Sequence, residues 1–236
     1  MIKQNKISNL AFKFGMLGMT GVTMGMLIAI ALEVTSLADF FSYCVYNSVS
    51  QLGTYSRSPS AVILNGGLFF GSLTASLGCV FALQASNGFA VRLFWLCIAV
   101  QFVSLAAMGL FPMNVYHLHI NALLTYVTLG VFVAGCFILV SGNLSIKVKV
   151  MGRIIAVGLL VIHGCLLVIP QYMEWSQGEP LVNFFVVAER MTSVSPRPSM
   201  WWQAWGFWLC LILQMGLALM MLYTQPHQSA EQSVAS

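Results

Sequence analysis

Residues 109–121 read GLFPMNVYHLHIN and form a short polar break between two long apolar runs. Pro112 ends the first run, because proline has no backbone N–H and disfavours a helical conformation in the residue before it. The break holds His117 and His119, two of the four histidines of the chain. An imidazole at the mouth of an apolar helix costs solvation free energy unless a polar group pairs with it. The stretch therefore predicts a helix end, a turn and a histidine that needs a partner.

The composition on either side of this break is that of a membrane protein. The chain has 236 residues, of which 59% are hydrophobic and 7% are charged, whereas about a quarter of a soluble domain is charged. A helix needs roughly 20 apolar residues to cross a bilayer. Six such runs occur, at 10–32, 60–84, 90–111, 118–141, 153–170 and 200–224. We predict an all-α bundle of six transmembrane helices over residues 1–225, followed by a disordered cytoplasmic tail over 226–236.

The charged residues orient this bundle. With a cytoplasmic N-terminus, seven basic residues lie on cytoplasmic segments, namely Lys3, Lys6, Lys13, Arg92, Lys147, Lys149 and Arg153. Only Arg57, Arg190 and Arg197 lie on the other side, together with five of the six acidic residues. Basic residues are enriched in the cytoplasmic loops of membrane proteins. We predict an integral protein of a bacterial inner membrane with both termini cytoplasmic, so that the break at 109–121 faces outward.

Polar side chains also recur within the apolar runs. Serine and threonine there are most simply explained by helix packing, but a buried amide such as that of Asn65 needs several hydrogen-bond partners. His117 and His119 project about 200° apart on a regular helix, so they cannot both face one pocket. His117 shares a face with Asn121, Thr125 and Thr128, whereas His119 shares one with Ala122, Tyr126, Gly130 and Ala134. Small residues mark a face pressed against neighbouring helices, and we therefore expect His119 to be the buried, partnered histidine.

Three segments resemble a known family. They are Ser48–Gly53 (SVSQLG) with Ser58-Pro59 and NGGL at 65–68, GLFP at 109–112 with LHINA at 118–122, and Ala188-Glu189-Arg190. Together they resemble the six-helix bacterial and archaeal membrane family called domain of unknown function 998. More distantly, they are similar to eukaryotic six-helix proteins linked to autophagy modulation and GPI-anchor remodelling. The resemblance implies the six-helix fold and an outward-facing motif cluster, but no settled activity. The chain departs from the family pattern at Met113 and in the proline-containing stretch 193–199.

The sequence leaves three functions open. The first is binding of a lipid headgroup or small polar ligand by an outward-facing site, for which the candidate residues are Ser50, Asn65, His117, His119 and Arg190. The second is a metal-dependent, membrane-embedded lipid hydrolase. Zinc needs about three protein ligands and an open fourth position, for which the candidates are His117, His119, His163 and Asp39, with Ser50 orienting the substrate. The third is a small transporter, although no internal repeat of the transporter type is visible.

The remaining expectations concern cofactors, partners and cysteines. We expect no cofactor, and the scattered basic residues argue against nucleic-acid binding. Membrane lipids are the expected partners, and a homo-oligomer is left open. Five of the six cysteines lie in apolar runs and only Cys44 lies in a connection. We therefore predict that none forms a disulfide.

Overall fold

The fold is a helical bundle whose spans agree with the six apolar runs. A computed structural model describes residues 2–55, 57–176 and 202–234, and no strand occurs among them. Six helices are long and apolar enough to cross a membrane, over Lys6–Ala31, Ala61–Ala85, Phe89–Leu110, Met113–Val140, Ile146–Ile169 and Trp202–Thr224. Helices suit a bilayer because each satisfies its own backbone hydrogen bonds. The prediction of an all-α, multi-pass membrane protein is thus confirmed.

The described elements follow one another along the chain in this order. The spans are α1 (Ile2–Ala31), a continuous second helix made of α4 (Ala61–Gly66), the π-helical turn η1 (Gly67–Gly71) and α5 (Ser72–Ala85), then α6 (Phe89–Leu110), α7 (Tyr116–Val140), α8 (Ile146–Ser176) and α10 (Trp202–Val234). The shorter elements are α2 (Leu37–Tyr46), α3 (Val49–Leu52), and the 3-10 turns η2 (Met113–Val115) and η3 (Ser141–Asn143).

Several helices extend beyond their apolar runs. Helix α1 begins at Ile2 rather than at residue 10, and α8 begins at Ile146 rather than at residue 153. Helix α10 continues to Val234, through the tail that the composition predicted to be disordered. Apolar content marks the part of a helix that lies in the bilayer, whereas lysine, glutamine, glutamate and alanine are all good helix formers in water. Polar composition alone therefore did not indicate where these helices end.

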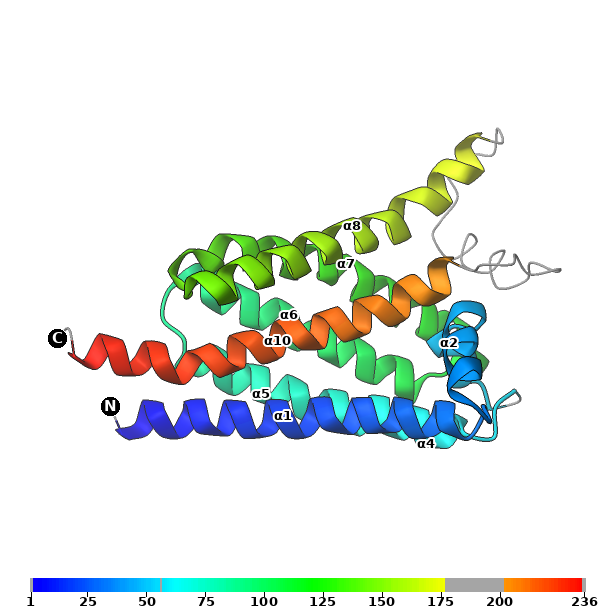
Figure 1. The fold of residues 1–236 in the computed structure, drawn as a ribbon, viewed down its shortest axis with the longest axis horizontal. Helices are drawn as coiled ribbons and strands as arrows, with labels where there is room; N and C mark the ends of the chain where they lie inside the picture. Colours follow the sequence, from blue (N-terminus) through cyan, green and yellow to red (C-terminus); the bar gives the residue numbers. More distant parts are fainter. Residues whose placement is uncertain (1, 56, 177–201, 235–236) are drawn as a thin grey trace.

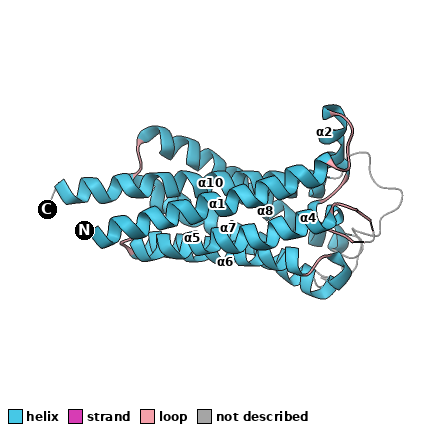
Figure 2. Ribbon diagram, turned by 90° about the horizontal axis from the view of Figure 1, so that it is seen from below, coloured by secondary structure: helices cyan, strands magenta, loops and turns pink. Residues whose placement is uncertain are grey.

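The spans pack against each other in chain order and close into a ring. Helix α1 packs on α5, α5 on α6, α6 on α7, α7 on α8 and α8 on α10, and α10 returns to α1. Both chain termini lie at the same end of the bundle, which we call the terminal end (Figure 1). Helix α2 lies beyond the opposite end of the spans, which we call the α2 end (Figures 1 and 2). The break at 109–121 joins α6 to α7 at the α2 end.

Glycines bring the first two spans into backbone contact. A Cβ at Gly18 of α1 would lie 2.2 Å from the backbone nitrogen of Ala75 and 2.5 Å from the carbonyl oxygen of Gly71. Likewise, a Cβ at Gly78 would lie 2.5 Å from the nitrogen of Gly15. Small residues at such spacing allow membrane helices to approach closely and to gain van der Waals contact. The absence of side chains therefore sets the distance between α1 and α5.

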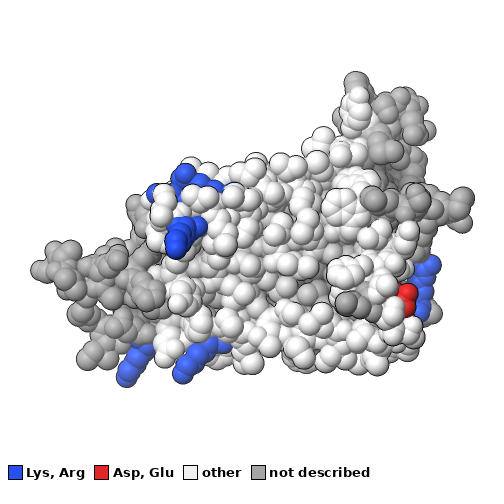
Figure 3. All heavy atoms as spheres, viewed as in Figure 1, with Lys and Arg blue, Asp and Glu red and all other residues white. Residues whose placement is uncertain are grey.

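Charge is divided between the two ends. Basic side chains gather toward the terminal end, and an acidic side chain lies beside a basic one at the opposite end (Figure 3). Among side chains that the structure describes, the acids are Glu33 and Asp39, both at the α2 end, where Arg57 is the basic residue. The other described basic residues lie toward the terminal end: Lys6, Lys13, Arg92, Lys147, Lys149 and Arg153. All six cysteines are free thiols.

Candidate functional site

His119 lies at the α2 end with both ring nitrogens hydrogen-bonded. Its side chain is 2% exposed, as the small-residue face of α7 predicted. Nδ1 is 2.8 Å from the carbonyl oxygen of Phe111, and Nε2 is 2.8 Å from the Oγ of Ser50. Because a carbonyl oxygen can only accept, Nδ1 carries the proton of this bond. In the neutral imidazole, Nε2 then accepts the hydroxyl proton of Ser50.

The break in the sequence creates this arrangement. The N–H of Phe111 donates the last helical bond of α6, to Ala107 at 2.8 Å. Pro112 then leaves the helix with an extended ψ of 174°, so the carbonyl of Phe111 has no helical N–H partner. After the single turn η2, α7 begins at Tyr116 and places His119 beneath that carbonyl. Because Pro112 ends the helix, the carbonyl of Phe111 stays free to accept the hydrogen bond that orients the imidazole of His119.

Ser50 reaches His119 from a one-turn helix in the first connection. Helix α3 begins after Ser48, whose hydroxyl accepts the N–H of Gln51 at 3.3 Å. Serine and threonine are favoured at such N-caps because they satisfy an orphan N–H. Ser50 follows two residues later and is half-buried, whereas its partner His119 is buried. Ser50 is therefore the less buried residue of the pair.

Two further bonds hold this connection against the bundle. The side-chain amide of Asn65, which is 4% exposed, donates to the carbonyl of Gly53 at 2.8 Å. A Cβ at Gly53 would lie 2.6 Å from Asn65 Oδ1, so a larger residue there would displace the Asn65 side chain. The N–H of Tyr55 donates to the side-chain oxygen of Asn114 in η2 at 3.2 Å. The structure thus brings Ser50, Asn65 and His119 to one connection, each through its own hydrogen bond.

A second polar cluster at the α2 end was not anticipated from the sequence. Glu33, just after α1, accepts hydrogen bonds from the hydroxyl of Ser58 and, at 3.0 Å, from that of Ser60. The two hydroxyls are 2.8 Å apart. Burial, together with the charge of Glu33, raises the pKa of Tyr43 to about 12. The sequence features that could have predicted this cluster are Glu33, which follows the first apolar run, and Ser58-Pro59-Ser60, which precedes the second.

His117 does not join Ser50 and His119. His117 is exposed and lies edge-on to the ring of Tyr116, with centroids 5.7 Å apart. Asn121 and Thr125, on the same face of α7, are also exposed. This face points away from the buried His119, as the 200° separation predicted. Arg190 lies outside the described residues.

The residues proposed as metal ligands are not brought together. His163 lies on α8, where its Nδ1 donates to the carbonyl of Leu159 at 2.9 Å, and its ring packs beside Tyr126, centroids 6.0 Å apart. Tyr126 is seven residues beyond His119, about 10 Å along the helix. Asp39 instead bonds Ser36, the N-cap residue of α2: its Oδ2 accepts the hydroxyl of Ser36 at 2.6 Å. Within the described ranges, no three His, Cys, Asp or Glu side chains form a group that could hold a metal ion.

Comparisons of the chain with protein-family models, with curated proteins and with solved structures find no match. Membership of the six-helix family therefore stays a prediction from the motifs.

Proposed function

We propose that this membrane protein binds a lipid headgroup at the Ser50–His119 pair. The observation that carries the proposal is the contrast in burial between the two partners: His119 is buried and bonded at both ring nitrogens, whereas Ser50 is only partly buried. His119 is the fourth residue of α7, and the ends of spanning helices lie at the depth of lipid headgroups. Because the Ser50 hydroxyl donates its proton to His119, its oxygen is a directional acceptor for a donor group of a headgroup, such as a glycerol hydroxyl or an ammonium.

The α2 end offers a charged group as well. Arg57 is exposed and lies on the same connection as Ser50. An arginine guanidinium pairs with phosphate through two parallel hydrogen bonds. An exposed cation and a fixed hydroxyl on one connection support a headgroup over an apolar ligand. A small polar ligand with the same chemistry is the other occupant that this site would accept.

Replacement of Ser50 by alanine tests the binding function. We expect the Ser50→Ala protein to retain about ten-fold less co-purified lipid than wild type in native mass spectrometry, because one directional hydrogen bond is lost. Ser42→Ala is the matched control, since Ser42 is exposed on α2, and should retain as much lipid as wild type. Equal lipid retention by wild type and Ser50→Ala would refute the site.

A specific observation also favours a hydrolase. A serine hydroxyl 2.8 Å from a histidine nitrogen, with the other nitrogen on a fixed acceptor, is the arrangement of an activated nucleophile, its base and the group that orients the base. Attack of the Ser50 Oγ on an ester carbonyl would pass the hydroxyl proton to His119 Nε2. His119 would then protonate the departing alcohol, and water would hydrolyse the acyl-serine. This second candidate uses the serine itself, in place of the metal centre that the sequence suggested.

Covalent labelling separates the two candidates. If Ser50 is a nucleophile, a fluorophosphonate probe should phosphonylate it in wild type and in His117→Ala. Labelling should be lost in Ser50→Ala and reduced about a hundred-fold or more in His119→Ala, the scale of a lost general base. Wild-type protein that retains lipid without any labelling of Ser50 would leave binding as the function and exclude the nucleophile.

We further propose that the α2 end faces out of the cytoplasm of a bacterial cell. The division of charge supports this orientation, because basic residues favour the cytoplasmic side. Reporter fusions after Asn114 in η2, before α7, and after Lys149 in the first turn of α8 should report the outer and the cytoplasmic compartment respectively. The reverse assignment would place the Ser50–His119 pair inside the cell.

A further inference from the structure

An open groove lies at the terminal end, far from the Ser50–His119 pair. It is lined by Leu83 of α5, by Gly88 in the turn, and by Phe89, Arg92, Leu93 and Leu96 of α6. Its volume is about 440 Å³, within the range of roughly 300–1,000 Å³ that is usual for small-molecule sites. Phe89 is 82% exposed and Leu96 is 49% exposed. The walls are therefore apolar side chains on the outer surface of the bundle, where lipid chains lie.

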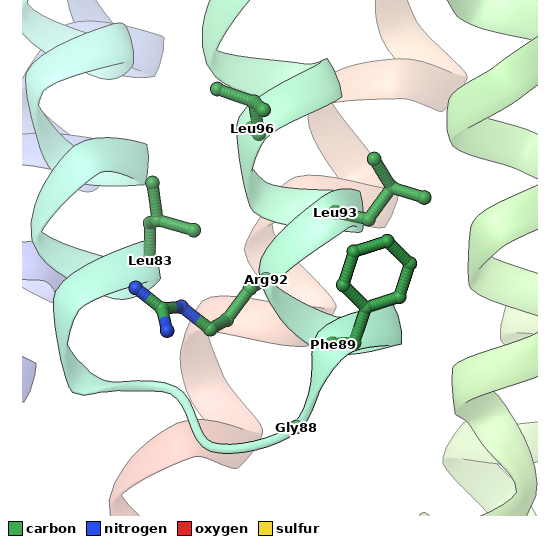
Figure 4. Close-up of a pocket in the computed structure, with 6 residues that line it drawn as sticks. All are labelled: Leu83, Gly88, Phe89, Arg92, Leu93 and Leu96. Carbon is green, nitrogen blue, oxygen red and sulfur yellow. The ribbon is translucent and has the colours of Figure 1, made fainter.

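A tight turn forms the floor of this groove. Gly88 has φ +88°, and among the described residues it is the one with positive φ. Most side chains are strained in that region, whereas glycine adopts it readily. The turn joins the end of α5 to the start of α6 and places Phe89 and Arg92 on the first helical turn beside Leu83. In Figure 4, Arg92 extends toward Leu83, while Phe89 and Leu93 lie together on the other side.

Arg92 has no carboxylate partner among the described side chains. The described carboxylates are Glu33 and Asp39, and both lie at the α2 end, hydrogen-bonded to serines. Lys13 lies at the level of the groove, since its neighbour Phe14 packs on Phe81 with ring centroids 5.5 Å apart. The apolar walls thus meet a cation whose charge is complementary to a phosphate at the membrane interface.

We propose that this groove binds an anionic phospholipid. The guanidinium of Arg92 binds the headgroup phosphate, and an acyl chain lies along Leu83, Phe89 and Leu96. Arginine suits this role because its planar fork bonds two phosphate oxygens at once, while its aliphatic stem packs on apolar neighbours. The inference does not depend on the function proposed for Ser50 and His119, which lie at the other end of the bundle.

Competition between two lipids tests the groove. Full-length protein is incubated with equimolar dioleoyl phosphatidylglycerol and dioleoyl phosphatidylcholine, and native mass spectrometry gives the ratio of the two bound lipids. We expect wild type to favour phosphatidylglycerol by about ten-fold, and Arg92→Gln to lower that ratio at least about five-fold. Lys147→Gln removes the same charge from the same end, outside the groove, and should stay within about two-fold of wild type.

Two further variants complete the test. Arg92→Lys keeps the charge but loses the second phosphate hydrogen bond, and should lower the ratio less than Arg92→Gln does. Leu96→Trp keeps Arg92 but fills the apolar wall, and should lower phosphatidylglycerol retention about as much as Arg92→Gln does. The proposal is overturned if wild type binds both lipids equally, if Arg92→Gln keeps the wild-type ratio, or if Lys147→Gln loses it to the same extent.

Discussion

Replacing Gly18 by alanine is expected to lower the free energy of unfolding by about 3 kcal/mol or more, the upper range for overpacked sites. The new methyl group would lie 2.2 Å from the nitrogen of Ala75 and 2.7 Å from its Cα. These are backbone atoms, which cannot move aside by changing a rotamer, so α1 and α5 would have to separate along their whole contact. Thermal unfolding in detergent, followed by the yield of monodisperse protein, measures the loss.

Gly135→Ala provides the control for Gly18→Ala. Gly135 lies in the interior of α7, and a Cβ there would meet nothing within 4 Å. Since alanine is favoured over glycine in a helix by about 1 kcal/mol, Gly135→Ala should be as stable as wild type or slightly more stable. A Gly18→Ala protein as stable as Gly135→Ala would show that the close approach of α1 and α5 is wrong.

Replacing His119 by alanine is expected to cost about 2–4 kcal/mol of stability. The change empties a buried volume and removes the bonds to both the Phe111 carbonyl and the Ser50 hydroxyl. We expect lipid retention to fall with it, as for Ser50→Ala. His117→Ala should change stability by less than about 0.5 kcal/mol, because His117 is an exposed side chain.

A double-mutant cycle shows whether the two residues act together. The double variant of Ser50→Ala and His119→Ala should be more stable than the sum of the single losses predicts, by about 1 kcal/mol, because their shared bond is counted once. Additive losses would indicate that Ser50 and His119 do not interact. A harmless His119→Ala beside a defective His117→Ala would reverse the choice of histidine.

The sequence predicted the spans well because bilayer crossing depends on local composition. The run at 90–111, for example, became α6 over Phe89–Leu110. The burial of His119 was also predicted, because the helical period separates it from His117 and its face of α7 carries small residues, although the polar stripe favoured His117. Helix ends outside the bilayer were not predictable from hydropathy, as the early start of α8 at Ile146 shows.

The sequence could not predict which residues pair with each other within the site. Ser50 and His119 are 69 residues apart, and their bond depends on where the one-turn helix α3 packs, which no periodicity records. The cluster of Glu33, Ser58 and Ser60 likewise joins the ends of two different spans. A close helix contact at the glycines could have been predicted from the sequence, because Gly67 and Gly71 are four residues apart. This spacing is typical of close contacts between membrane helices. Which helix they face required the structure.

The ring of helices in chain order has a consequence for biogenesis. As each span leaves the ribosome and enters the bilayer, its packing partner is already there, because it is the span made just before. The α1–α5 contact can form when only two spans exist, and contacts between sequence neighbours form quickly because little chain entropy is lost. Helix α10 is different, since it must meet both α8 and α1. Translation of the last span therefore closes the assembly, and until then the flanks of α1 and α8 that receive it remain open to lipid or to membrane chaperones.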